Sequence, residues 1–108
     1  MPLRKSCLIQ LLLPVTDNAG RRFPDSTWEA LKDKLVERFG GVTAFLHTPA
    51  EGVWAPSPER RTAEDVFIVE VMSETFDAAW WSKLQRELET ALDQEHVVIR
   101  VLGFRELI

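Results

Sequence analysis

Two amphipathic stripes, each placed between short apolar runs, constrain what this chain of 108 residues can fold into. The first stripe recurs at three- and four-residue steps and consists of Trp28, Leu31, Leu35 and Phe39. This spacing puts all four side chains on one face of a helix. Ser26 and Glu29 match the S-x-x-E capping box that begins many helices, and Gly40-Gly41 supply a left-handed stop. The sequence therefore predicts a first helix that ends at Phe39.

The second stripe predicts another helix in the last third of the chain. It comprises Phe76, Trp80, Leu84, Leu88 and Leu92, with Trp81 on its border. Between and around the two stripes lie four short runs of apolar residues that predict strands. These runs are Cys7–Leu13, Val42–His47, Val66–Met72 and Val97–Leu102.

The order of these patterns predicts an α+β fold with the ferredoxin-like β-α-β-β-α-β layout. Right-handed crossovers in two strand–helix–strand units give a sheet of strand order 4-1-3-2, with both helices on one face. The result is a two-layer sandwich. A chain of 108 residues has room for one core, so we expect residues 1–108 to form a single domain.

Composition excludes several classes of function. The net charge of −4 argues against a nucleic-acid surface or an anionic membrane as partner, and no apolar run approaches the roughly 20 residues of a membrane span. Cys7 is the sole cysteine, which rules out an internal disulfide and favours a reducing, cytoplasmic location. His47 and His96, the two histidines, lack metal-ligand spacing, so we expect no metal. Without a P-loop or dinucleotide fingerprint we expect no cofactor.

Several short segments resemble a family of small bacterial proteins of unknown function, some of them short lipoproteins. The segments are Trp28, Arg38-Phe39, Gly41-Val42-Thr43, Gly52-x-Trp54 and Gln94-Glu95-x-Val97. The resemblance runs from Asp25 to Val101 and implies the same ferredoxin-like fold. It brings no established activity, and this chain lacks the lipoprotein signal of those members.

Alternation along the predicted strands defines a second face of the sheet, away from the helices. That face carries Leu8, Gln10, Leu12, Val66, Ile68, Glu70, Met72, Val98, Arg100 and Leu102. Most of these side chains are aliphatic, and such a surface is normally covered. We therefore expect a homodimer that packs through this face in the manner of a dimeric α/β barrel.

One polar residue from each of three strands would form a row, Arg100–Gln10–Glu70, across this face. An isolated charge in an apolar surface costs several kcal/mol of hydration unless it is paired. One interpretation is a polar network that fixes the register of the dimer. Another is the floor of a ligand site within a dimeric barrel, and a third makes Glu70 a general base tuned by Arg100.

The loops at one end of the predicted fold suggest a second site, for an anion. They gather Arg21, Arg22, Arg60, Arg61, His47, Trp54 and His96 next to the beginning of the first helix. Arginines beside a helix N-terminus can bind phosphate or carboxylate. The alternative is a solvated rim, because many acidic residues lie in the same loops.

We expect the chain to be a dimeric, non-enzymatic protein that binds a small molecule. If the arginine site is the binding site, we expect that molecule to be an anion. The expected binding residues are Arg22, Arg61, His47, Trp54, Gln10, Glu70 and Arg100. One alternative is a cofactor-independent dimeric barrel enzyme of the monooxygenase or isomerase type. The other is a protein-interaction domain that uses the open face.

Overall fold

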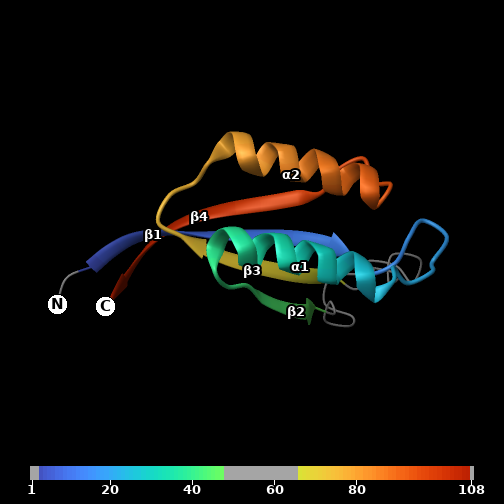
Figure 1. Ribbon diagram of the computed structural model, residues 1–108, viewed down its shortest axis with the longest axis horizontal. Helices are drawn as coiled ribbons and strands as arrows, with labels where there is room; N and C mark the ends of the chain where they lie inside the picture. Colours follow the sequence, from blue (N-terminus) through green and yellow to red (C-terminus); the bar gives the residue numbers. More distant parts are fainter. Residues whose placement is uncertain (1–2, 48–65, 108) are drawn as a thin grey trace, which may run out of the picture.

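The computed structural model of the chain describes residues 3–47 and 66–107. Its elements follow the predicted alternation of strands and helices (Figure 1). They are β1 (Leu3–Pro14), α1 (Asp25–Phe39), β2 (Thr43–His47), β3 (Val66–Ser73), α2 (Ala78–Ala91) and β4 (Val98–Leu107). The fold is α+β.

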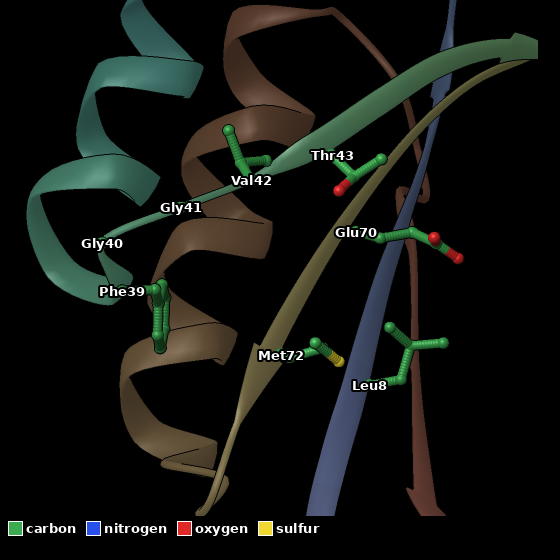
Figure 2. Close-up of a pocket in the computed structure, with 8 residues that line it drawn as sticks. All are labelled: Leu8, Phe39, Gly40, Gly41, Val42, Thr43, Glu70 and Met72. Carbon is green, nitrogen blue, oxygen red and sulfur yellow. The ribbon is translucent and has the colours of Figure 1, made fainter. Parts of the chain in front are cut away.

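The four strands form one antiparallel sheet in the order β2-β3-β1-β4, which reads 4-1-3-2 from the β4 edge. β1 is central: it pairs with β3 from Cys7 to Pro14 and with β4 from Leu3 to Leu12. Both helices lie on the same side of the strands (Figure 2). The other side of the sheet has no covering element among the described residues.

The core lies between that helical layer and the sheet. Its buried side chains alternate along β1 and β3, as Ile9, Leu11, Leu13, Val69 and Val71, and Val97 directly precedes β4. The helices contribute Leu31, Leu35, Trp81, Leu84 and Leu88, and Leu92 follows α2 directly. The predicted helix-facing side is thus confirmed for β1 and β3. Val101, which lies opposite Ile9 and so shares the helix-facing side by alternation, is nevertheless 42% exposed, because β4 is an edge strand and Val101 lies outside the packed cluster.

The helix ends differ in part from the prediction. Pro24 is the N-cap of α1 and no side chain caps that end, so the predicted capping box of Ser26 and Glu29 is wrong. Ser26 already lies inside the helix, which begins one residue earlier. The stop at Gly40 is confirmed, since its φ of 80° is left-handed and its N–H donates to the Val36 carbonyl.

The sequence placed Trp80 in the buried stripe of α2 and Trp81 on its border, and the structure shows the reverse. Trp81 is 2% exposed and sits in the core, whereas Trp80 is only partly buried. The guanidinium of Arg38 lies 4.5 Å from the ring centroid of Trp80, in a cation–π contact near the protein surface. The buried stripe therefore begins at Trp81 and steps by three residues to Leu84, which fits the 3.6-residue turn as well as the predicted stripe did.

Trp81→Ala should destabilise the fold by about 3–5 kcal/mol, because it removes a large buried aromatic side chain and leaves a cavity. Trp80→Ala should cost clearly less, since Trp80 is partly solvated. Urea denaturation of both variants, followed by far-UV circular dichroism, measures the difference. Equal losses of stability for the two substitutions would contradict this assignment of the core.

Candidate functional site: the open face and its hollow

The face of the sheet away from the helices, which we call the open face, exposes much of its apolar surface. Met72 is 59%, Val98 47% and Leu102 45% exposed, and Leu8, Leu12 and Ile68 are partly exposed. Figure 2 shows Leu8, Glu70 and Thr43 pointing away from the helices. Contiguous apolar surface of this kind commonly marks a binding or association site.

The strand register aligns polar side chains in one row across the open face. Gln10 lies opposite Arg100 on β4 and opposite Glu70 on β3, and Glu70 lies opposite Thr43 on β2. The Gln10 amide Nε2 donates to Glu70 Oε2 over 2.6 Å. Arg100 is exposed and makes no ion pair with any residue that the structure describes. The row thus runs Arg100, Gln10, Glu70 and Thr43, with the cation at the β4 edge and the carboxylate on β3.

An apolar row flanks the polar row on each side. The first consists of Val98, Leu12 and Ile68, and the second of Leu102, Leu8 and Met72. The open face is therefore striped, with apolar, polar and apolar rows crossing three strands. A striped face can associate with another surface in only a few registers, because a shifted register would set apolar side chains against charges.

A hollow of about 590 Å³ opens on this face beside the beginning of β2. β3 continues to Ser73, but β2 begins only at Thr43, opposite Glu70. The segment Gly40–Val42, which connects α1 to β2, therefore does not pair with the last residues of β3. The space is lined by Leu8, Phe39, Gly40, Gly41, Val42, Thr43, Glu70 and Met72 (Figure 2). Sequence reasoning missed this hollow; its only signal was Gly40-Gly41 between the helix and the strand.

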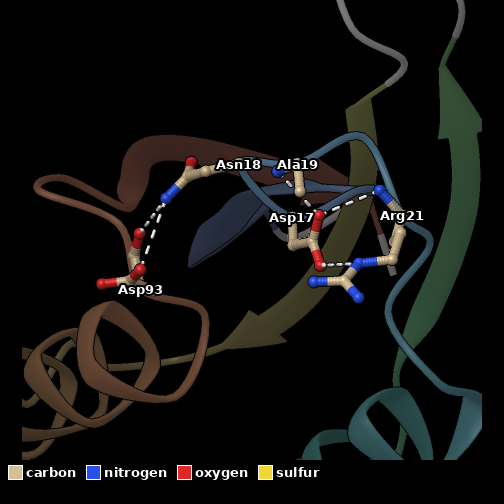
Figure 3. A network of polar contacts seen from close by, with 5 residues as sticks. All are labelled: Asp17, Asn18, Ala19, Arg21 and Asp93. Atoms are coloured by element: carbon tan, nitrogen blue, oxygen red, sulfur yellow. Dashed lines mark hydrogen bonds and ion pairs between the residues drawn. The ribbon is translucent and has the colours of Figure 1, made fainter.

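At the other end of the sheet, the β1–α1 loop and the loop between α2 and β4 are joined by hydrogen bonds from side-chain amides. Asn18, in the β1–α1 loop, donates from Nδ2 to the Asp93 carbonyl over 3.0 Å (Figure 3). Gln94 in turn donates to Asn18 Oδ1 over 3.3 Å. Asp93 has a φ of 52°, the left-handed conformation that aspartate tolerates better than most residues.

Of the four arginines predicted to build an anion site, Arg21 and Arg22 lie among the described residues. Arg21 pairs with Asp17 at 3.4 Å, as the alternative of a paired rim expected, and Arg22 is exposed. Arg60, Arg61 and Trp54 lie outside the described residues, as does the side chain of His47. His96 is exposed in the loop between α2 and β4. The anion site therefore stays a prediction.

Asp17 organises the β1–α1 loop through hydrogen bonds to its carboxylate. The backbone N–H groups of Arg21 and Ala19 each donate to Asp17 Oδ1 over 2.9 Å (Figure 3). The bond from the Arg21 N–H contributes most to lowering the pKa of Asp17 below its ordinary value of 3.8.

A lowered pKa in the folded state predicts how the stabilisation by this carboxylate depends on pH. The stabilisation is fully present above about pH 3.8, the unfolded value, and is lost as the pH falls through the lower folded value. Asp17→Asn, which keeps an acceptor but removes the charge, should therefore lower the urea midpoint at pH 7, and by less at about pH 2, because the loss begins as the pH falls below about 3.8. A difference of the same size at both pH values would contradict this role of the charge.

Metal-ligand clusters and membrane-spanning helices are both absent from the described part of the chain. No group of three or more metal-ligating side chains occurs in residues 3–47 and 66–107. Over the same ranges, no helix is long and apolar enough to cross a membrane.

Comparison of the chain with protein-family models, with curated proteins and with solved structures gave no match. The resemblance to a small bacterial family thus stays an expectation from the sequence. Function must therefore be inferred from the geometry of the open face and its hollow.

Proposed function

We propose that this chain acts as a homodimer that binds a small, largely apolar organic molecule in the hollow beside Glu70. The observation that carries the proposal is that the hollow opens onto an exposed apolar face of the sheet. A second copy packed on that face would cover the hollow and the exposed apolar side chains together.

Association of two copies is supported by the composition and shape of the open face. Leaving Met72, Val98 and Leu102 in water forgoes burial worth about 25 cal/mol for each Å² of apolar surface. Antiparallel sheets often leave one face in water, but that face is then mostly polar. Two such sheets pack face to face about 10 Å apart, so that side chains from both faces interdigitate.

The chemistry of the hollow supports a ligand with an apolar body and a hydrogen-bond donor. Its volume of about 590 Å³ falls within the roughly 300–1,000 Å³ usual for small-molecule sites. Leu8 and Met72 supply apolar contacts, and the Glu70 carboxylate, oriented by Gln10, accepts hydrogen bonds. An amine, alcohol or amide on the ligand would satisfy that carboxylate.

Ile68→Glu should convert the dimer to monomers, because it would place a desolvated carboxylate within the interface. Val36→Glu is the matched control, since Val36 is an exposed aliphatic residue on α1, away from the open face. Size-exclusion chromatography with light scattering measures the mass of each. A monomeric parent chain at micromolar concentration would refute the homodimer and favour a surface that grips another protein.

Gly41→Phe should weaken ligand binding, because Gly41 lines the hollow and the new ring would occupy part of it. A side chain at Gly41 meets no atom within 4 Å at its Cβ, so the fold should tolerate the substitution. Gly103→Phe is the control: its Cβ is equally unobstructed, and it lies outside the hollow.

The assay is a thermal-shift screen of the parent chain against small organic amines, alcohols, amides and carboxylic acids. A compound that stabilises the parent and Gly103→Phe, but not Gly41→Phe, supports the hollow as the site. Stabilisation of all three proteins to the same degree would place the ligand elsewhere.

A further inference from the structure

The polar row of the open face carries opposite charges on either side of its middle residue. Arg100 on β4 and Glu70 on β3 each lie opposite Gln10 of β1, so that Gln10 separates them by one strand on each side. Adjacent strands are about 4.8 Å apart, which puts the two charged residues about 10 Å apart along the row. Gln10 bonds to Glu70, but Arg100 has no acidic partner among the described residues.

This arrangement becomes self-complementary when two copies face each other across a two-fold axis. An axis lying between the two sheets, parallel to β1 and passing over Gln10, exchanges the two sides of each row. The partner's Arg100 then lies opposite Glu70, and Arg100 lies opposite the partner's Glu70. Isologous contacts of this kind always occur twice in a two-fold dimer.

The competing axis runs along the row itself and gives the opposite result. It sets Arg100 against the partner's Arg100, and Glu70 against the partner's Glu70. Like charges brought together in an interface cost several kcal/mol, so the charges select the axis parallel to β1.

The apolar rows are compatible with the selected axis. Rotation about an axis parallel to β1 keeps each row at its own height along the strands, so that apolar rows pack on their own copies. Met72 then faces the partner's Leu102, and Ile68 faces the partner's Val98. No charge is placed against an apolar row.

We infer that the open face associates with a second copy in this register, and that the partner's Arg100 pairs with Glu70 at the hollow. The inference rests on the proposed homodimer and adds its geometry and a binding residue. Because Glu70 lines the hollow, the site is incomplete in one chain: the partner supplies its cation. A ligand carrying both a hydrogen-bond donor and a carboxylate could then bond to Glu70 and to the partner's Arg100.

A charge exchange tests the register. Arg100→Glu and Glu70→Arg should each raise the dimer dissociation constant by roughly a hundredfold, because each creates two like-charge contacts. The variant that carries both substitutions restores opposite charges at both contacts, and its dissociation constant should return to near the parent value. Analytical ultracentrifugation of the four proteins gives these constants, and circular dichroism shows that each is folded.

The outcomes separate the register from the dimer itself. A double variant as weak as either single variant, or single variants as tight as the parent, overturns the register while leaving the dimer standing. A monomeric parent chain overturns both.

Salt provides a second measurement should Glu70→Arg fail to fold. The Arg100→Glu dimer should tighten as ionic strength rises, because salt screens its new repulsion, whereas Arg100→Gln should not tighten in this way. The same response to salt in both variants would also overturn the register.

Discussion

The position of β1 at the centre of the sheet, paired on both sides, determines the rest of this structure. Its odd-numbered residues Ile9, Leu11 and Leu13 are at most 1% exposed, so they fix which face the helices cover. Because side chains alternate along a strand, a slip of one residue would bring Gln10 into the core and expose a leucine or isoleucine. The register of β3 and β4 against β1 then follows, and with it the striped open face.

Much of the fold could be predicted because its signals are local and repeated. Two helical stripes and four apolar runs give the order of the elements, and alternation identifies the residues on each face of β1 and β3. Prediction failed where two local solutions fit equally well. The spacing allowed either Trp80 or Trp81 to begin the buried stripe of α2. Both rings pack on Phe39 with centroids 5.3 Å apart, and only burial in the folded core, where Trp81 is 2% exposed, distinguishes them. The predicted capping box is likewise absent, because the helix begins directly after Pro24 and not after Ser26.

The candidate site was predictable only in part, for a physical reason. A row across a sheet depends on register, which alternation supplies, so the alignment of Gln10 with Glu70 and Arg100 could be deduced. A hollow depends on where a strand ends relative to its neighbour, and no pattern in the sequence marks that β2 begins opposite Glu70. Charge counts at the loop end could not reveal that Asp17 takes Arg21 as its own partner.

A polar row within an apolar face weakens association, yet it restricts how the two faces can meet. A face made only of aliphatic residues would bind more tightly but would accept several registers, including edge-shifted ones. Burying Arg100 and Glu70 requires that each find an opposite charge, since an unpaired buried charge costs far more than the pair contributes. Gln10 already orients Glu70, so less side-chain entropy is lost when a cation approaches. The polar row would thus lower the affinity of the dimer but restrict it to a single arrangement of the two copies. In that arrangement the partner's Arg100 lies at the hollow.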